Sequence, residues 1–228
     1  DDLHFACRDS RMNRTMILVG AAVALGMAVF VGALLYVTAK TQPSAPAVAR
    51  DPAALVQFYS PTIGNPDARV HIVEFLDPAC ETCATMYPYV KQMMAANPDR
   101  IRLTIRHLAF HDGSDYAIKA LEAARRQGKY WPALEALLAK QALWTRNHTV
   151  QPELVWKALD GLGLNVEQAK VDMNAPEIAQ RIEQELRDAR TLNVTQTPEY
   201  FVNGRPLPSF GLEQLQALVR DALQTAYR

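Results

Sequence analysis

The stretch VHIVEFLDPACETC, residues 70–83, decides the expected fold of this chain. Its first half, Val70–Leu76, is a run of β-branched, aliphatic and aromatic residues that is typical of a strand buried on both faces of a sheet. Apolar residues then recur at helical spacing over residues 80–96, so a helix is expected there. Cys80 and Cys83 therefore stand where a buried strand gives way to a helix.

The position of Cys80 at the start of a helix predicts an acidic thiol. Free backbone amides and the helix dipole stabilise an anion there, so Cys80 is the expected nucleophile and Cys83 the expected resolving cysteine. Two thiols at this spacing can close a small disulfide and exchange it through a mixed disulfide with a substrate protein. The sequence thus predicts a redox pair that uses no organic cofactor and no metal.

Two other uses of the cysteine pair are less favoured. A structural disulfide across so short a loop would constrain the unfolded chain little. A tetrahedral zinc site would need a second pair of cysteines or histidines beside this lone C-x-x-C. The chain has only three cysteines, whereas a disulfide-stapled scaffold of this size normally carries several pairs.

Length and charge narrow the function classes further. The chain has 228 residues, of which 49% are hydrophobic, so it can bury one sizeable core but is short for two full domains. Its 24 lysines and arginines balance 24 aspartates and glutamates, and no basic run with interleaved aromatic residues occurs. We therefore expect no nucleic-acid binding.

Residues 16–38, MILVGAAVALGMAVFVGALLYVT, contain no charged side chain. At about 1.5 Å per residue, a helix of this length crosses a hydrocarbon core of about 30 Å, so we expect a transmembrane anchor. A cleaved secretory signal is the alternative, with residues 37–39 or 47–49 as its cleavage pattern. Either outcome delivers the rest of the chain to the extracytoplasmic side of a membrane.

The charges that flank the anchor predict its orientation. Several arginines lie within the N-terminal segment, residues 1–15, and only Lys40 follows the apolar run closely. The positive-inside rule then places residues 1–15 in the cytoplasm. Cys7 would lie across the membrane from the other two cysteines, as a bystander thiol.

The rest of the chain alternates between strand-like and helix-like segments. Residues 39–52 are rich in proline, alanine and small polar residues, which predicts an extended tether before a folded domain at 53–228. A second strand is expected at residues 101–110. Residues 115–192 then give a series of helices broken by turn signals, which predicts a helical insertion.

A hairpin and a helix close the expected domain. Asn203-Gly204 is a strong two-residue hairpin signal between strands at Glu199–Val202 and residues 205–207. Leu212–Ala226 has the periodicity of an amphipathic helix. The predicted order is strand, helix, strand, helical block, hairpin and helix.

This order and several short motifs resemble the thioredoxin superfamily, in particular its DsbA-like branch. The resemblance covers about residues 59–223 and implies an α/β thioredoxin-like fold with an inserted helical subdomain, here expected after one transmembrane helix. The matching elements are Pro61-Thr62-Ile63-Gly64 with Asp67-Ala68, Glu74-Phe75 before the cysteines, and Thr197-Pro198 followed by Tyr200-Phe201-Val202-Asn203-Gly204.

The resemblance implies roles for residues outside the cysteine pair. Pro198 would be a cis proline facing the pair, and the backbone of Thr197 would bind an extended substrate segment; an ordinary proline at a strand start is the alternative. Glu74 matches the acid that relays a proton to or from the second cysteine, unless it reaches solvent at a strand edge. Pro88 matches a proline that kinks the active-site helix, or else begins a second helix.

The chain departs from the strongly oxidising members inside the motif. Those members carry a histidine before the second cysteine, whereas Thr82 is neutral and Glu81 is negative; both are expected to border the bound substrate. A negative charge disfavours the thiolate of Cys80, which predicts a weaker oxidant and leaves a reductase or an isomerase open. Glu199 also replaces a residue that is usually apolar.

A copper-binding or copper-delivery module is the alternative function from another class. His107, His111 and Met86, together with Cys80 and Cys83, offer ligands suited to copper(I). A redox-inert interaction domain would leave the position of the cysteine pair at a helix start without a reason.

The favoured function is a protein thiol-disulfide oxidoreductase. Its expected partners are cysteine-containing protein substrates and a membrane or soluble redox partner that resets the pair. Its expected location is the bacterial inner membrane, as a single-pass protein whose catalytic domain faces the periplasm.

Overall fold

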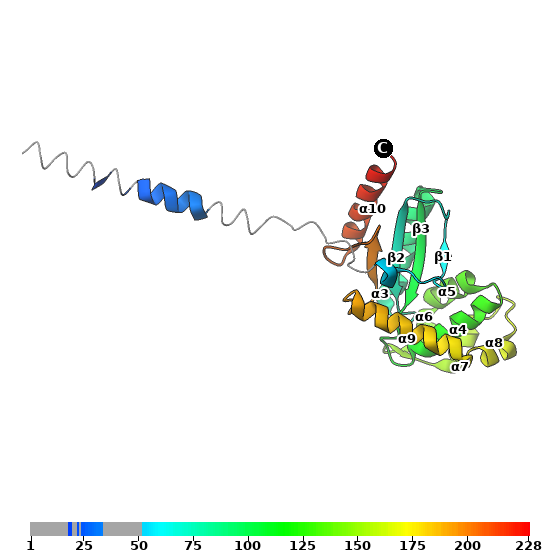
Figure 1. Cartoon of the computed structure of the whole chain (residues 1–228). Coiled ribbons are helices and arrows are strands. Elements are labelled where there is room, and N and C mark those ends of the chain that lie inside the picture. Colours follow the sequence, from blue (N-terminus) through cyan, green and yellow to red (C-terminus); the bar gives the residue numbers. More distant parts are fainter. Residues whose placement is uncertain (1–17, 20–21, 23, 34–51) are drawn as a thin grey trace, which may run out of the picture. The chain divides into compact units, whose positions relative to one another are not determined.

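The computed structural model describes residues 18–19, 22, 24–33 and 52–228 (Figure 1). In these ranges, we find no helix that combines the length and the hydropathy needed to span a membrane. The expected N-terminal segment at 1–15 lies outside the described residues, and so do most of the expected anchor at 16–38 and of the tether at 39–52. The membrane anchor therefore stays a prediction.

Residues 52–228 build one mixed sheet with helices around it (Figure 1). The strand order is β1-β3-β2-β6-β7, with β2 and β3 parallel and the other neighbours antiparallel. The strands of this sheet are β1 at Thr62–Ile63, β2 at Val70–Leu76, β3 at Ile101–His107, β6 at Glu199–Val202 and β7 at Arg205–Pro206.

The helices fall into two groups along the chain. Within residues 52–228, the helices outside the insertion are α2 at Pro52–Leu55, α3 at Glu81–Ala96 and α10 at Leu212–Ala226. Between β3 and β6 lie α4 at Ser114–Arg126, α5 at Tyr130–Ala139, α6 at Gln141–Trp144, α7 at Pro152–Ala158, α8 at Val166–Asp172 and α9 at Pro176–Thr191. A small hairpin interrupts this block, formed by β4 at Thr145–Arg146 and β5 at Thr149–Val150.

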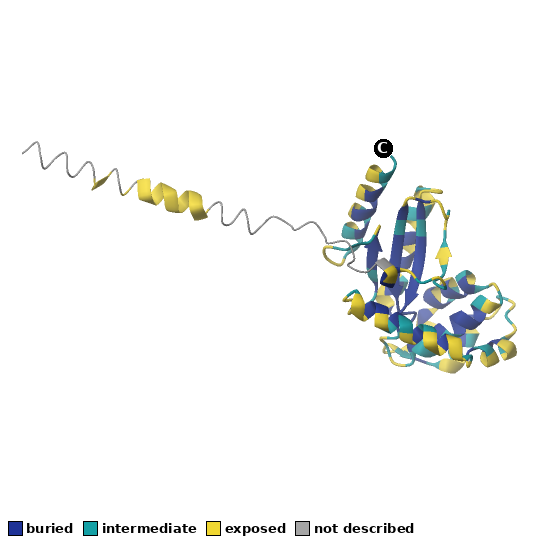
Figure 2. Cartoon of the chain, viewed as in Figure 1, coloured by how far each residue is buried: buried dark blue, intermediate teal, exposed yellow. Residues whose placement is uncertain are grey.

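The central strand β2 is buried on both faces, as its composition predicts (Figure 2). Ile72 and Leu76 belong to a core cluster that includes buried side chains of α3 and α10. Val73 and Phe75, which point to the opposite face, pack in a second cluster with residues of α2 and α9. The strand that leads to the cysteines is therefore held rigidly between two helical layers.

The second strand is shorter than predicted. It was expected at residues 101–110, but β3 ends at His107. The backbone N–H groups of Phe110 and His111 donate to the carboxylate of Asp77, at 2.8 and 2.9 Å, instead of continuing the sheet. A side chain from the loop after β2 thus turns the chain toward the helical insertion.

A fully buried arginine joins the sheet to α9. The guanidinium of Arg106 on β3 donates to Glu185, Asp188 and the backbone carbonyl of Ala54, each at 2.6 Å. Both carboxylates belong to α9, and Ala54 belongs to α2. This network pins both helices to one face of the sheet.

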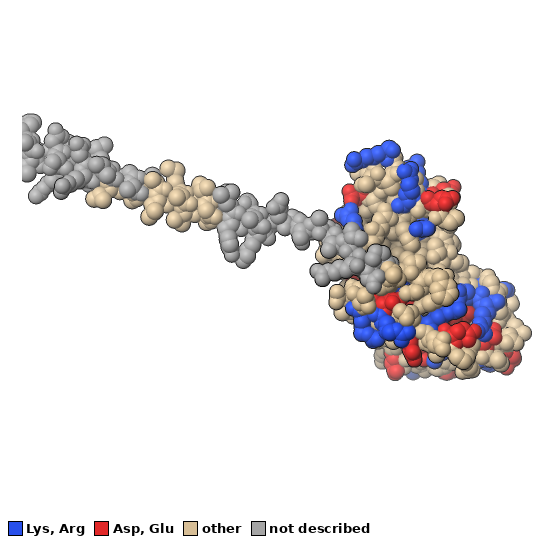
Figure 3. Space-filling view, in the orientation of Figure 1, with Lys and Arg blue, Asp and Glu red and all other residues tan. Residues whose placement is uncertain are grey.

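The surface carries charges of both signs. Figure 3 shows blue and red side chains interspersed over one face of residues 52–228. Several pairs join different elements, such as Arg126 of α4 with Asp172 of α8 at 3.0 Å, and Arg205 of β7 with Asp221 of α10 at 2.6 Å. This mixing agrees with the zero formal net charge of the sequence.

Candidate redox site

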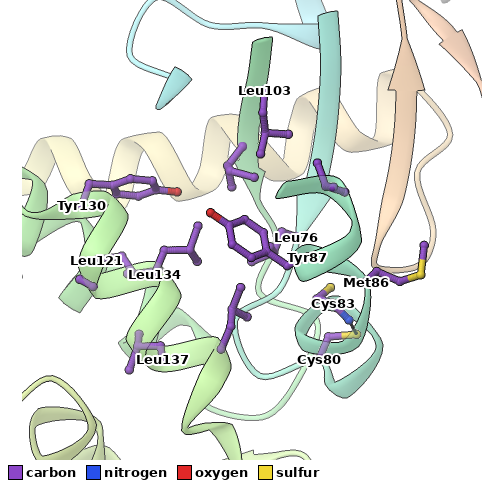
Figure 4. Close-up of a cluster of buried hydrophobic side chains, with 14 of the residues drawn as sticks. Leu76, Cys80, Cys83, Met86, Tyr87, Leu103, Leu121, Tyr130, Leu134 and Leu137 are labelled. Carbon is purple, nitrogen blue, oxygen red and sulfur yellow. Dashed lines mark hydrogen bonds between the residues drawn. The ribbon is translucent and has the colours of Figure 1, made fainter. Parts of the chain in front are cut away.

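The two cysteines lie at the N-terminus of α3, after the loop that leaves β2 (Figure 4). Cys80 is the N-cap residue, and its sulfur accepts a hydrogen bond from the backbone N–H of Cys83 at 3.4 Å. Both cysteines are buried and carry free thiols. The helix therefore directs its unpaired amides at the sulfur of Cys80, as the sequence predicts.

The surroundings separate the acidities of the two thiols. Hydrogen bonds, foremost from the side chain of Cys83 and then from backbone amides, outweigh burial and lower the pKa of Cys80 to about 5. Burial, followed by the hydrogen bond with Cys80, raises the pKa of Cys83 far above its usual range. At neutral pH, Cys80 is a thiolate and Cys83 a protonated thiol.

The negative charge of Glu81 has less influence than the sequence suggested. Its side chain is exposed in the first turn of α3, and Thr82 beside it is exposed as well. Water screens a charge in such a position, whereas the hydrogen bonds to Cys80 act within a buried site. The hydrogen bonds that lower the pKa of Cys80 therefore outweigh the opposite effect that was expected from Glu81.

Glu74 lies in the middle of β2 and is fully buried. The hydroxyl of Tyr200 donates to its Oε1 at 3.0 Å, while its Oε2 has no hydrogen-bond partner among the described residues. Burial raises the pKa of Glu74 to about 8, against the opposing effect of the Tyr200 hydrogen bond. A glutamate that reaches solvent, the alternative from the sequence, is wrong. The charge of Glu74 is also one of the causes that raise the pKa of Cys83, so the two groups interact.

The peptide bond between Thr197 and Pro198 is cis, as predicted. In its thiol form, Cys80 donates a hydrogen bond to the carbonyl oxygen of Thr197 at 3.3 Å. Pro198 is buried immediately before β6, and Glu199 begins that strand half-buried, with its pKa raised by burial. The loop that contains Pro198 thus faces the cysteine pair, although 117 residues separate Cys80 from Thr197.

Pro88 lies inside a continuous helix. The helix α3 runs from Glu81 to Ala96 with Pro88 within it. The alternative from the sequence, in which Pro88 begins a second helix, is wrong.

Two residues that position the cysteine loop were missed from the sequence. Asp77 is a fully buried acceptor for five hydrogen bonds, one of them from the backbone N–H of Ala79. The side-chain amide of Gln141 donates to the carbonyls of Pro78 and Cys80, at 2.7 and 3.0 Å. Asp77 could have been suspected from its place three residues before Cys80, but nothing near Gln141 in the sequence points to this contact.

The five residues proposed for copper do not form a common site. The side chain of His107 is buried and its Nε2 bonds the hydroxyl of Tyr130 at 2.7 Å. His111 bonds Asp77 through its Nδ1 at 2.8 Å. In the described part of the chain, no three His, Cys, Asp or Glu side chains are grouped to hold a metal ion.

A family model and several curated proteins match this chain in sequence. A family model described as thioredoxin matches residues 57–221. The Na(+)/H(+) antiporter NhaA of Herminiimonas arsenicoxydans is 34% identical over 144 residues, which are 63% of this chain and 22% of the antiporter. NhaA 3 of Salinispora tropica is 30% identical over 167 residues, 72% of this chain and 24% of that protein. The chain thus spans less than a quarter of the length of these curated relatives.

Solved structures resemble this chain over about three quarters of its length. A thioredoxin-like oxidoreductase from Silicibacter pomeroyi DSS-3 superposes with a TM-score of 0.66 at 32% identity, covering 76% of this chain and 98% of that one. BdbD from Bacillus subtilis gives 0.64 at 22% identity, with coverages of 72% and 93%. The thiol-disulfide exchange protein alpha-DsbA2 from Wolbachia pipientis gives 0.62 at 21% identity, with coverages of 74% and 90%. The last two likenesses concern the fold alone.

The thioredoxin-like α/β fold that the sequence predicts is confirmed by these matches, whereas they do not test the transmembrane helix expected before it. Because the family model covers well over half of its residues, this chain belongs to the thioredoxin family, with the fold of the DsbA-like thiol-disulfide oxidoreductases.

Proposed function

We propose that this protein is a thiol-disulfide oxidoreductase that exchanges disulfides with cysteine-containing protein substrates through Cys80 and Cys83. The observation that carries the proposal is the sulfur of Cys80 at the helix N-terminus, 3.4 Å from the amide of Cys83 and 3.3 Å from the carbonyl of Thr197. A thiolate at neutral pH, beside a loop that can meet a substrate, is what disulfide exchange requires.

Exchange proceeds in two steps, the formation of a mixed disulfide and its resolution. The thiolate of Cys80 attacks a substrate disulfide, forms a mixed disulfide and releases one substrate thiolate. Cys83 then gives its proton to Glu74 and attacks the sulfur of Cys80, which closes the disulfide between the two cysteines and releases the second substrate thiolate. Two electrons pass to the substrate; the reverse sequence oxidises a substrate dithiol.

Glu74 is the proposed proton acceptor for Cys83. The high pKa of Cys83 means that this thiol needs a base before it can attack. A buried carboxyl with a pKa of about 8 can take up and return a proton near neutral pH. Because the two groups also interact electrostatically, these shifts support proton transfer from Cys83 to Glu74.

The proposed substrate-binding surface comprises the start of α3 and the loop that contains Pro198. The backbone of Thr197 would bind an extended substrate segment, while Pro198 separates this segment from β6. The exposed side chains of Glu81 and Thr82 would border the same segment. The half-buried Glu199 adds an acidic group near this surface, so substrates with basic residues close to their cysteine would be preferred.

The proposed location is the extracytoplasmic side of a bacterial inner membrane, with residues 16–38 as the anchor. The uncharged run in the sequence supports this, and one solved structure of similar fold, at 22% identity and a TM-score of 0.57, is a periplasmic thioredoxin-like protein from Salmonella enterica. A second redox protein would then reset the cysteine pair after each turnover.

The direction of electron flow follows from the stability of the reduced form. A Cys80 pKa of about 5 favours the reduced thiolate, which makes the pair a better oxidant than the sequence motif suggested. We therefore propose disulfide formation in substrates as the main activity, over reduction or isomerisation. Equilibration of the full chain with glutathione buffers measures the potential; a value near that of thioredoxin, about −270 mV, would favour a reductase instead.

The mechanism is tested by trapping the mixed disulfide. The Cys83→Ser variant, mixed with an oxidised multi-cysteine protein, is expected to accumulate a covalent complex that reducing agents release. The Cys80→Ser variant is the matched control and is expected to trap nothing and to lose activity in insulin reduction and in refolding of a reduced protein. Trapping by Cys80→Ser alone would reverse the assigned roles, and trapping by neither variant would refute the proposed exchange.

A further inference from the structure

Tyr200 lies directly opposite Glu74 on the neighbouring strand. The two residues are register partners between β2 and β6, and both side chains are fully buried. The hydroxyl of Tyr200 donates to Oε1 of Glu74 at 3.0 Å. Among the described residues, Oε2 of Glu74 has no hydrogen-bond partner. The two oxygens of one buried carboxyl therefore have different surroundings.

We propose that Tyr200 is a positioning residue for proton transfer between Cys83 and Glu74. Its hydroxyl occupies one carboxyl oxygen and so leaves the other as the oxygen that takes up the proton. This inference rests on the proposed function of Glu74 as the proton acceptor, and it assigns the orientation of that acceptor to a residue outside the cysteine motif.

The hydrogen bond can persist through the whole transfer. Oε1 of Glu74 accepts from the Tyr200 hydroxyl when the carboxyl is ionised, and it still has a lone pair to accept with when the proton sits on Oε2. The tyrosine donor stabilises the ionised form and opposes the effect of burial. Without it, the carboxyl would be protonated over a wider pH range and would less often be ready to act as a base.

Tyr200 also links the acid to the proposed substrate loop. It follows Pro198 by two residues, and the carbonyl of Thr197 contacts the sulfur of Cys80. The short segment 197–200 therefore reaches Cys80 at one end and Glu74 at the other. A displacement of this segment would alter both the thiolate and the base that serves Cys83.

Few other titratable groups face Glu74. Glu74 interacts electrostatically with Cys80, the N-cap residue of α3, and with Cys83 and Tyr87 within that helix. It also interacts with Tyr200 of β6. In the neighbouring strand β3, the register partner of Glu74 is Ile105, which carries no charge. The residues of α10 in the adjacent core are apolar, namely Leu215, Leu218, Val219 and Ala222. In the oxidised protein, where neither cysteine has a thiol to titrate, a change at Tyr200 can therefore be followed in the titration of Glu74.

The test uses the resolving step with a small disulfide. Reduced full-length protein is mixed with glutathione disulfide, which forms a mixed disulfide at Cys80. Cys83 then passes its proton to Glu74, its sulfur bonds to Cys80, and glutathione leaves as a thiolate with the electron pair of the broken bond. The rate of this release is measured by rapid mixing between about pH 5 and pH 9.

The Tyr200→Phe variant removes the hydroxyl and keeps the ring. We expect the midpoint of the pH–rate profile to move up by about one pH unit, which is a roughly tenfold slower release below the midpoint. The carbon-13 shift of the Glu74 carboxyl in the oxidised protein should show the same rise in pKa. The matched control is Tyr87→Phe. That hydroxyl donates to Glu135 at 3.4 Å, and burial raises the pKa of Tyr87 so far that it carries no charge between pH 5 and pH 9, so the profile should keep the original midpoint.

Two further variants keep the test decisive. Site-specific 3-fluorotyrosine at position 200 has a more acidic hydroxyl, so the midpoint should move down, even if the phenylalanine variant folds poorly. An unchanged midpoint in both variants at position 200 would overturn the inference. If the Glu74→Gln variant kept the original pH–rate profile, the proposed role of Glu74 as proton acceptor would be refuted. This result differs from an unchanged midpoint in the Tyr200 variants alone, which would refute only the role of Tyr200.

Discussion

Nδ1 of His111 and the carboxylate of Asp77 lie 2.8 Å apart, which joins the loop before the redox cysteines to the segment that begins the helical insertion. The same carboxyl accepts from the N–H groups of Ala79, Phe110 and His111 and from the hydroxyl of Ser114. The buried side chain of Asp77 thus fixes both the loop before the cysteines and the segment after β3.

Replacement of Asp77 should destabilise the protein strongly. In Asp77→Asn, an amide group must face several donors that the carboxylate now satisfies, and each buried donor left without a partner costs about 1–3 kcal/mol. We expect the free energy of unfolding in urea to fall by about 3 kcal/mol or more. The exposed Asp112→Asn is the control and should cost less than about 0.5 kcal/mol. A loss at Asp77 as small as in the control would contradict this account.

The thiolate of Cys80 should depend on Cys83 more than on Glu81. The absorbance of the thiolate near 240 nm should titrate with a pKa of about 5 in the reduced protein. In Cys83→Ala the main hydrogen bond to the sulfur is lost, so the pKa of Cys80 should rise clearly. In Glu81→Gln, where an exposed charge is removed, it should change little. A larger shift in Glu81→Gln than in Cys83→Ala would show that the local charge dominates after all.

The stability of the protein should fall with rising pH because of Glu74. Burial raises the pKa of this carboxyl from 4.5 to about 8, so between these values the folded state binds more protons than the unfolded state. The contribution of protonated Glu74 to the free energy of unfolding is fully present below about pH 4.5. It is lost as the pH rises through about 8.

The Glu74→Gln variant isolates this effect, because glutamine still accepts the hydrogen bond from Tyr200. The difference in free energy of unfolding between the variant and the original protein should shift in favour of the variant by a few kcal/mol between about pH 5 and pH 9. Glu185, whose pKa burial raises to about 7, is present in both proteins and cancels in the difference. A difference that does not vary with pH would argue that Glu74 ionises normally.

Arg106 should be the arginine whose loss costs the most stability. In Arg106→Met the carboxylates of Glu185 and Asp188 remain buried without their partner, which costs about 3–5 kcal/mol. The matched control is Arg205→Met, whose partner Asp221 is more than half exposed, and it should cost less than about 1 kcal/mol. Thermal or urea unfolding measures both.

The triple variant Arg106→Met, Glu185→Gln, Asp188→Asn removes the three charges together. Because it leaves no unpaired charge, it should recover a large part of the loss seen in the single variant. If the triple variant were no more stable than Arg106→Met, the cost would come from packing and not from unpaired charge.

Short-range patterns were sufficient to predict the central part of this protein from its sequence. The alternation of side chains in Val70–Leu76, the helical spacing after Cys80 and the Asn203-Gly204 signal depend on neighbours within one turn or one strand. Such patterns report local backbone geometry, which is why the strand, the helix start and the acidic position of Cys80 agree with the structure.

Local patterns do not reveal contacts with side chains that are distant in the sequence. Residues 101–110 have strand-like composition throughout, but the strand ends at His107 because Asp77, more than thirty residues away, captures the next amides. The ligand types of His107 and His111 suited copper, yet each is engaged by another partner, Tyr130 or Asp77. Residue type alone carries no information about such partners.

From its sequence alone, the protein has a redox-capable cysteine pair between a buried strand and a helix, because hydrophobic period and helix-end chemistry are properties of adjacent residues. Only the tertiary structure brings Thr197 to Cys80 and Tyr200 to Glu74, across 117 and 126 positions of the chain. The first contact brings the loop that contains Pro198 to the nucleophile, and the second engages one carboxyl oxygen of Glu74. Hydrogen bonds act over a few ångströms in space, whatever the separation along the chain.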